Sequence, residues 1–238
     1  ADGIQKAVEQ QMRSERLKTE LITNVSHDIK TPLTSIVSYV DLLKKEKMPS
    51  DAARQYLDVL DRQSARLKKL TEDLVEASKA STGNLSCTLE PTDVNVLLGQ
   101  VMGEYEGKLE AGQLEPIVLE DPSSPKILAD GRLLWRVFDN LLSNICKYAM
   151  PGTRVYLSSA VENGKVVICF KNISRSALNI SADELMERFV RGDSSRNTEG
   201  SGLGLSIAQS LTSLQQGTFA LSVDGDLFKA SVTFDALS

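Results

Sequence analysis

The sequence has few aromatic residues, few prolines and a single histidine. Of its 238 residues, 5% are aromatic, seven are proline and only His27 is histidine. One histidine cannot build a His-rich metal site or a second imidazole relay, so any imidazole chemistry falls to His27. Cys87, Cys146 and Cys169 are odd in number, far apart and without the spacing of metal ligands. We expect them to be reduced, mostly buried thiols of a cytosolic protein.

The sequence also lacks a large excess of either charge and any long apolar run. The net charge of −5 gives no sign of a nucleic-acid-binding surface. No run reaches the roughly 18 apolar residues that a membrane span needs, and no signal peptide pattern is present. The chain begins without Met, so we expect it to be part of a longer protein, in which any span lies outside this sequence. An apolar content of 41% with 25% charged residues is typical of a soluble globular protein of one or two domains.

The first third of the chain is predicted to be two long helices. Residues 4–46 form the first, and Ser50 or Asp51 caps a second that runs to about residue 80. Two antiparallel helices cannot bury both apolar stripes alone. We therefore expect a homodimeric four-helix bundle; the alternative is a monomeric hairpin packed on the rest of the chain. The stripe of the first helix comprises Ile22, Val25, Ile29, Leu33, Ile36, Val40 and Leu43.

His27 points away from this stripe. At about 100° per residue it lies about 170° from the stripe's centre, and Thr31 lies about 150° from it, on the same face as His27. Asp28 could accept a hydrogen bond from one ring nitrogen and leave the other nucleophilic. Pro32 removes a backbone donor inside the helical pattern, so a bend is expected there. The string His27-Asp28-Ile29-Lys30-Thr31-Pro32 resembles the phospho-acceptor box of sensor histidine kinases of two-component systems.

The remainder of the chain is predicted to be a mixed α+β sandwich, with one sheet and helices on one face. The domain boundary is placed in the turn cluster Ser81-Thr82-Gly83-Asn84, which gives domains of residues 1–83 and 84–238. Hairpins are expected around Asn163-Gly164 and Asp224-Gly225-Asp226. The expected strands lie near 85–89, 116–119, 154–161, 165–172, 219–223 and 228–234, and the expected helices near 94–109, 132–148, 183–189 and 203–214.

Two stretches of this second region carry phosphate-binding chemistry. Gly200, Gly202 and Gly204 flank the start of a helix at Leu203, where backbone N–H groups can approach an anion closely. It is not a Walker loop, because no Gly-Lys-Ser/Thr follows. The other stretch is the helix 132–148. Asn140 and Asn144 share one of its faces, where amide oxygens could coordinate Mg²⁺ and Lys147 could neutralise a phosphate; two exposed polar residues are the alternative.

Together these motifs resemble the ATP-binding domain shared by histidine kinases, gyrases, mismatch-repair ATPases and heat-shock chaperones. Residues 140–148 match its N box, 187–191 its F box and 200–205 its G2 box. The resemblance implies that Asn144 holds Mg²⁺ with help from Asn140. It also implies that Lys147 and Tyr148 contact phosphate and ribose. Residues 191–201, beginning with Arg191, would form a mobile lid over ATP.

The G1 box departs from the family. The family has Asp-x-Gly-x-Gly, whose Asp accepts from the adenine amino group, whereas this chain has Asn172-Ile173-Ser174-Arg175-Ser176. Asn172 can accept through its amide oxygen, but it loses the charge that strengthens such a bond by roughly 1 kcal/mol or more. Both glycines are replaced, so a stiffer loop beneath the base is expected.

The resemblance implies a homodimeric sensor histidine kinase that uses ATP and Mg²⁺. His27 would attack the γ-phosphoryl group, and the phosphoryl group would pass to an aspartate of a separate response regulator. Thr31 matches the position that orients a water for dephosphorylating the regulator. The expected location is the cytoplasmic region of a membrane-anchored sensor, with membrane contact only through segments absent from this chain.

Two other classes of function are alternatives. An ATP-hydrolysing machine of the gyrase or chaperone type carries a Glu one turn before the metal-binding Asn. Here that position is Asn140, which cannot act as a base, and the box around His27 has no role in such enzymes. A catalytically weakened dimeric scaffold is the alternative that the altered G1 box favours. Failure to bind Mg·ATP at millimolar nucleotide would indicate the scaffold.

Overall fold

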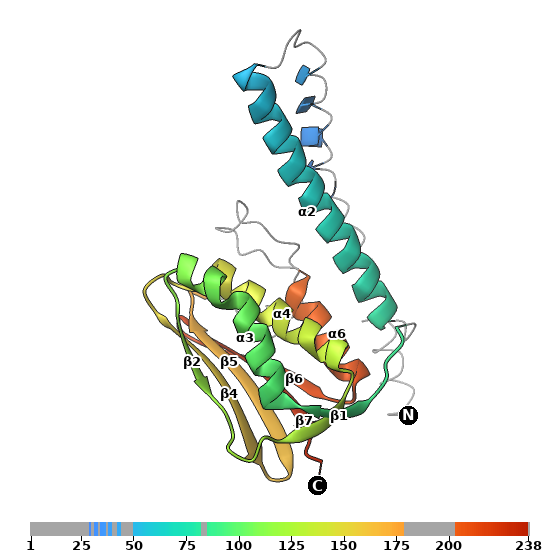
Figure 1. The fold of residues 1–238 in the computed structure, drawn as a ribbon, viewed down its shortest axis with the longest axis vertical. Coiled ribbons are helices and arrows are strands. Elements are labelled where there is room, and N and C mark those ends of the chain that lie inside the picture. Colours follow the sequence, from blue (N-terminus) through green and yellow to red (C-terminus); the bar gives the residue numbers. More distant parts are fainter. Residues whose placement is uncertain are drawn as a thin grey trace, which may run out of the picture. The chain divides into compact units, whose positions relative to one another are not determined.

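The structure is a computed structural model that describes residues 29, 31–32, 34–36, 38–39, 42–43, 50–81, 85–178 and 203–237. The described residues up to Leu74 belong to one compact unit, and those from Val75 onward belong to a second (Figure 1). Within the described residues, no helix is long and apolar enough to cross a membrane.

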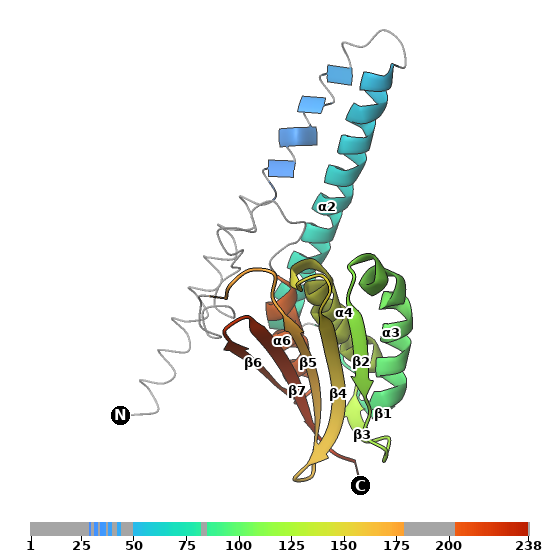
Figure 2. The same ribbon diagram turned by 90° about the vertical axis from the view of Figure 1, so that its left-hand side faces the viewer.

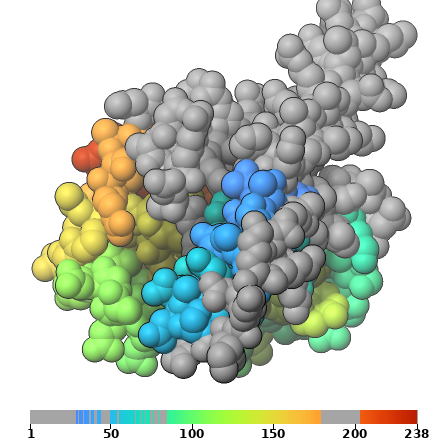
Figure 3. All heavy atoms as spheres, turned by 90° about the horizontal axis from the view of Figure 1, so that it is seen from above, coloured from blue at the N-terminus to red at the C-terminus, as the bar shows by residue number. Residues whose placement is uncertain are grey.

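The first unit is helical. Its described residues between 29 and 43 are helical, and so is α2, which spans Asp51–Ser81 and continues past Leu74 into the second unit. Of the two caps that the sequence offers, Ser50 caps α2, because its hydroxyl accepts a hydrogen bond from the Ala53 N–H at 3.1 Å. The rings of Tyr39 and Tyr56 pack with centroids 5.6 Å apart, which brings the two helical segments together. Blue and cyan atoms of the two helical segments adjoin in the space-filling view (Figure 3).

The second unit is an α+β sandwich, as the sequence predicts. The helices α3, α4 and α6 cover one face of a five-stranded sheet with the order β2-β4-β5-β7-β6 (Figure 2). Only the β2–β4 pair is parallel. The elements are β1 Glu90–Asp93, α3 Val94–Ala111, β2 Glu115–Leu119, β3 Lys126–Ala129, α4 Gly131–Tyr148, β4 Arg154–Glu162, β5 Lys165–Ile173, α6 Gly204–Leu214, β6 Thr218–Asp224 and β7 Leu227–Asp235.

The core of this unit lies between the helices and the sheet. The period of two along β5 points Val166, Ile168 and Phe170 to the helical side, where all three are fully buried. Phe138 of α4 packs its ring against Phe170, with centroids 5.5 Å apart and planes inclined by 49°. Such a tilted aromatic pair contributes about 0.5–1.5 kcal/mol beyond the area that it buries. This packing fixes the rotation of α4 about its axis, and therefore which of its polar residues face outward.

Aspartates cap the two longer helices of the sandwich. Asp93 accepts hydrogen bonds from the N–H groups of Asn95 and Val96 at the start of α3. Asp130 does the same for α4, and its carboxylate also accepts from the Arg132 guanidinium at 3.0 Å and the Thr88 N–H at 3.1 Å. Burial acts to raise the pKa of Asp130, but the hydrogen bonds, that of Arg132 foremost, hold this pKa below its ordinary value.

The turns follow the sequence signals. Asn163 and Gly164, between β4 and β5, have φ values of 51° and 76°. Positive φ at both central residues matches the right-handed twist of the two strands, which is why Asn-Gly favours a hairpin. Gly225, between β6 and β7, has φ of 57°, so the second predicted hairpin is also confirmed.

Two expectations about the strands were wrong, and one strand was not expected. Residues 85–89 form no strand, because the Thr88 N–H bonds to the side chain of Asp130 instead of to a neighbouring strand. The strand lies after them, at Glu90–Asp93, and pairs with β3, which the sequence did not indicate. The sandwich therefore has a second sheet of two strands in addition to the main one. Pro91 is tolerated because β1 pairs on one side only.

Candidate nucleotide-binding site

Asn140, Asn144 and Lys147 of α4 become more exposed toward the end of the helix. Asn140 is 7% exposed, Asn144 is half-buried and Lys147 is exposed. The Asn140 side-chain nitrogen donates to the Arg136 carbonyl oxygen at 2.9 Å. This bond fixes the orientation of the amide and turns its oxygen away from the preceding turn. Asn140 is therefore not an exposed polar residue, which was the alternative interpretation of this helix face.

The start of α6 lies against Asn140. A Cβ atom placed on Gly204 would be 3.4 Å from the Asn140 side-chain oxygen, so α4 and α6 approach closely at this point. The N-cap residue of α6 is Leu203, which is fully buried and makes no side-chain capping bond. The first N–H groups of a helix have no partner inside it, and the helix dipole makes this end an attractive place for an anion. The structure therefore brings Gly204, at the start of α6, next to the side chain of Asn140.

The end of α4 meets the segment that departs from the G1 box. The Tyr148 carbonyl oxygen accepts from the Arg175 N–H at 2.8 Å, and Met150 N–H donates to the Ile173 carbonyl at 2.8 Å. Asn172, at the end of β5, is 4% exposed, and its side-chain nitrogen donates to the Ile173 carbonyl at 3.1 Å. Asn172 and Tyr148 thus belong to adjoining segments, although they are 24 residues apart in the sequence.

Several predicted site residues lie outside the described residues. They are His27, Asp28, Arg191, Gly200 and Gly202, together with the rest of the F box. Their roles stay predictions. Thr31 is helical and exposed, and its carbonyl oxygen accepts from the Ser35 hydroxyl at 3.2 Å. The exposure of Thr31 agrees with the face on which the sequence pattern places it.

The sequence did not indicate a network of charged side chains one turn before Asn140. The guanidinium of Arg136 donates to Asp139 at 2.9 Å and to Glu76 at 3.0 Å. The Tyr105 hydroxyl donates to Asp139 at 2.6 Å. Burial, and then this hydrogen bond, raise the pKa of Tyr105 far above its ordinary value, so the hydroxyl stays a donor at any physiological pH. Arg136 and Asp139 are three apart on α4, and that spacing was the one available signal.

The cysteines have no nucleophilic role that the structure supports. All three are free thiols. Burial is the main cause that raises the pKa of Cys146, and Lys108 and Lys147 oppose it only in part. Burial likewise raises the pKa of Cys87 and Cys169. Thiols in such surroundings are protonated at neutral pH and react slowly.

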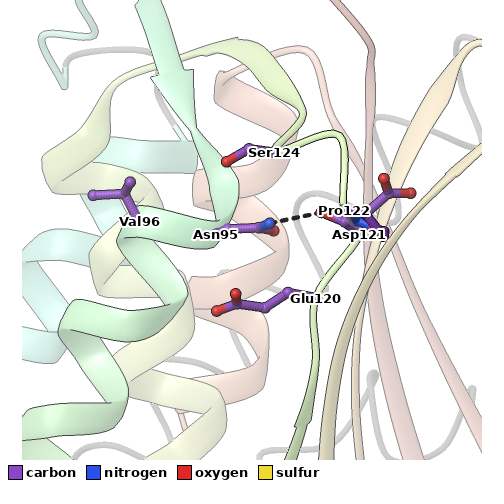
Figure 4. Close-up of a pocket in the computed structure, with 6 residues that line it drawn as sticks. All are labelled: Asn95, Val96, Glu120, Asp121, Pro122 and Ser124. Carbon is purple, nitrogen blue, oxygen red and sulfur yellow. Dashed lines mark hydrogen bonds between the residues drawn. The ribbon is translucent and has the colours of Figure 1, made fainter.

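A separate shallow pocket lies beside the start of α3 and holds about 500 Å³ (Figure 4). Its lining includes Glu120 and Asp121, two residues whose carboxylates would repel a phosphate chain. The Asn95 side chain donates across it to the Asp121 carbonyl oxygen at 2.9 Å (Figure 4). None of the predicted nucleotide-binding residues lines this pocket. It is therefore no candidate for the triphosphate site.

The fold and the site together define a class. The arrangement matches the one expected for the ATP-binding domain. Helices cover one face of a mixed sheet, and α4, which carries Asn140, packs against the start of α6 at Gly204. Residues 129–236 match the model of the histidine kinase-, DNA gyrase B- and HSP90-like ATPase. Residues 17–83 match the model of the His Kinase A phospho-acceptor domain. The chain belongs to the sensor histidine kinases of two-component systems.

Relatives and solved structures agree with this assignment. The sensor protein VanSC of Enterococcus gallinarum is 32% identical over 201 residues, which cover 83% of this chain and 55% of the relative. The sensor protein kinase WalK of Staphylococcus haemolyticus is 30% identical over 226 residues, 92% of this chain and 36% of the relative. The chain thus spans about half or less of the length of these curated relatives.

Two solved structures share the fold. The histidine kinase AdeS of Acinetobacter baumannii superposes with a TM-score of 0.73 at 20% identity, covering 89% of this chain and 98% of that one. The histidine kinase ThkA, solved in complex with the response regulator TrrA, superposes with a TM-score of 0.74 at 20% identity. That match covers 98% of this chain and 66% of ThkA. At this level of identity the likeness concerns the fold.

Proposed function

We propose that this chain is the catalytic region of a sensor histidine kinase that phosphorylates itself on His27 and passes the phosphoryl group to a response-regulator aspartate. The observation that carries the proposal is the Asn140–Gly204 contact in the same chain as the box around His27. That contact puts an oriented amide beside the start of α6, where the side chain of the N-cap residue Leu203 makes no capping bond. A domain division near residue 83 and a homodimer belong to the same proposal.

The described residues fit a nucleotide bound with Mg²⁺. The amide oxygen of Asn144 is the proposed metal ligand, because Mg²⁺ prefers oxygen donors, and the nearly buried Asn140 supports it from one turn earlier. Lys147, exposed on the same helix, would offset phosphate charge. The metal would neutralise charge on the phosphates when bound.

The start of α6 and the end of β5 would hold the two ends of the nucleotide. Gly204 and the glycines before it would let backbone N–H groups approach the phosphates closely. Tyr148 would contact the ribose. Asn172 would receive the base, because its nitrogen is bonded to the Ile173 carbonyl and its oxygen remains to accept from the adenine amino group. Arg191 would belong to the lid that covers the bound nucleotide.

The proposed chemistry at His27 is an in-line displacement. One ring nitrogen of His27 forms a bond to the γ-phosphorus, the bond from that phosphorus to the bridging oxygen breaks, and ADP leaves. Asp28 orients the ring through its other nitrogen or takes its proton. Positioning and charge neutralisation supply the catalysis, since a loose phosphoryl transition state asks little else of the protein.

The helical unit has two features that support further parts of the proposal. Leu57 follows Ala53 and precedes Leu60 at helical spacing on α2, yet it is 55% exposed, as expected if a second copy completes a four-helix bundle. Thr31 is exposed one turn after His27, where its hydroxyl could orient a water for dephosphorylating the regulator. We therefore include regulator phosphatase activity in the proposal.

Labelling with γ-labelled ATP tests the central claim. The wild-type chain should acquire acid-labile, base-stable label in the presence of Mg²⁺, and a His27→Gln variant should acquire none. An Asn144→Ala variant should lose label while His27 is intact, because it removes the proposed metal ligand. Label on the His27→Gln variant would refute the assignment of the acceptor. Absence of Mg·ATP binding by the wild type at millimolar nucleotide would favour the weakened scaffold instead.

A further inference from the structure

Arg136 is held between two carboxylates from different helices. Its Nε lies 3.0 Å from a Glu76 oxygen, and its Nη1 lies 2.9 Å from an Asp139 oxygen. The side chain of Arg136 is 19% exposed, and those of Glu76 and Asp139 are 21% and 19% exposed. Ion pairs shielded to this degree are screened less by salt than surface pairs and hold a more definite geometry. Glu76 belongs to the same compact unit as α4, since that unit begins at Val75.

The far side of this network is anchored in the core. Asp139 accepts from the hydroxyl of Tyr105, which is 3% exposed and belongs to α3. The pair is short, at 2.6 Å, and the donor cannot ionise in the physiological range because burial raises its pKa. Asp139 is therefore fixed, and Arg136 is the member that joins this fixed point to Glu76 near the end of α2.

The same residue borders the proposed nucleotide site. The Arg136 carbonyl oxygen holds the side-chain nitrogen of Asn140 at 2.9 Å, and the other end of that amide faces Gly204. A continuous set of contacts therefore runs from Glu76 through Arg136 and Asn140 to the start of α6. A shift of the Arg136 turn would rotate the Asn140 amide and change the space at Gly204.

We propose that Arg136 is a positioning residue that couples the end of α2, through the Glu76 ion pair, to the turn of α4 that binds the nucleotide. The inference rests on the proposed function for what the site binds, but the contact itself does not. Whatever alters the position of Glu76 alters the affinity for Mg·ATP, and by reciprocity nucleotide binding strengthens the Glu76–Arg136 pair. The last turns of α2, where Glu76 lies, are thereby linked to the state of the ATP site.

The first test compares Glu76→Gln with Glu115→Gln. Both remove one charge from a Glu–Arg pair, but the pair of Glu115 with Arg154 is about two-thirds exposed and lies on β2 and β4. Glu76→Gln should weaken Mg·ATP affinity about fivefold, a typical coupling between linked sites, and leave the labelling rate at saturating ATP unchanged. Glu115→Gln should leave both unchanged, and Glu76→Asp should restore part of the affinity.

A cycle with Arg136→Gln isolates the pair. If the two residues act through one another, the double variant should bind Mg·ATP no more weakly than Arg136→Gln alone. Losses that multiply in the double variant would overturn the coupling. So would equal effects of Glu76→Gln and Glu115→Gln, because that result would indicate a general effect of charge.

Amide hydrogen exchange without nucleotide separates this inference from the proposed function. Glu76→Gln should speed exchange in residues 136–148, and Glu115→Gln should not, because only the first removes a restraint on α4. This readout holds even if the wild type binds no ATP. Faster exchange supports the coupling in either case, and unchanged exchange in residues 136–148 overturns it.

Discussion

Replacing Asn172 with the family's aspartate is expected to destabilise this protein. Asn172 is 4% exposed, and its side-chain nitrogen donates to the Ile173 carbonyl at 3.1 Å. Asn172→Asp would put an oxygen where that nitrogen is, so the hydrogen bond is lost and two oxygens face each other. The lost bond costs about 1 kcal/mol, and leaving the carbonyl and a buried carboxylate unsatisfied costs about 1–3 kcal/mol more.

The cost is limited by protonation, which gives the prediction a pH signature. A carboxyl group in this position has its folded-state pKa raised by burial and by the facing carbonyl oxygen. The folded state then binds a proton more tightly than the unfolded state, whose pKa is about 3.9. The variant should therefore recover stability as the pH falls from the folded-state pKa toward about 4, since the protonated group can donate to the Ile173 carbonyl.

Thermal unfolding of the full chain, followed at several pH values, measures this effect. At pH 7.5 the midpoint of Asn172→Asp should lie roughly 5–10 °C below that of the wild type, since about 2–4 °C corresponds to 1 kcal/mol for a protein of this size. Asn163→Asp is the matched control, because it adds the same charge at an exposed turn of the same hairpin. An Asn172→Asp variant as stable as the wild type at pH 7.5 would show that the amide bond does not hold this segment.

Two further predictions concern the sandwich. Gly217→Ala should lower the free energy of unfolding by about 1–3 kcal/mol in denaturant titrations, because the new Cβ would lie 2.6 Å from the Phe234 ring. Gly107→Ala has no atom within 4 Å to meet and should stabilise α3 by up to about 1 kcal/mol; equal effects of the two would refute the steric argument. Asp130→Asn should keep the cap of α4 but lose the bond from the Thr88 N–H, at a cost of about 1–3 kcal/mol above pH 4. Because the folded-state pKa of Asp130 is lowered, its contribution is present above the unfolded pKa and is lost as the pH falls through the folded pKa. Stability curves of wild type and variant that stay parallel down to pH 2 would contradict this assignment.

Local signals in the sequence were enough for most of the elements. Asp93 and Asp130 cap helices because a carboxylate directly before an apolar period satisfies orphan N–H groups. Asn163-Gly164 makes a hairpin because both residues adopt positive φ readily. Asn140 and Gly204 were identified from spacing and composition, and the structure puts them in contact.

The misses have a common cause in contacts that are distant in sequence. The Thr88 N–H bonds to Asp130, 42 residues away, so a segment with strand-like alternation forms no strand. The buried Gln215 accepts from the Asp130 N–H at 2.9 Å and ties the end of α6 to the start of α4 across 85 residues. The spacing of apolar residues within a short stretch of sequence cannot predict such bonds, because the two partners are far apart in the chain.

The altered G1 segment has a backbone that does not require glycine. None of the described residues from 172 to 176 has a positive φ, so this backbone does not need the conformational freedom of glycine. Ser174 N–H donates to the Asp226 carbonyl at 2.7 Å, and Arg175 N–H donates to the Tyr148 carbonyl at 2.8 Å. These bonds use main-chain atoms that any residue supplies. In the proposed site the substitutions therefore act on the atoms that would face the base, chiefly the amide of Asn172, which would offer adenine a neutral acceptor.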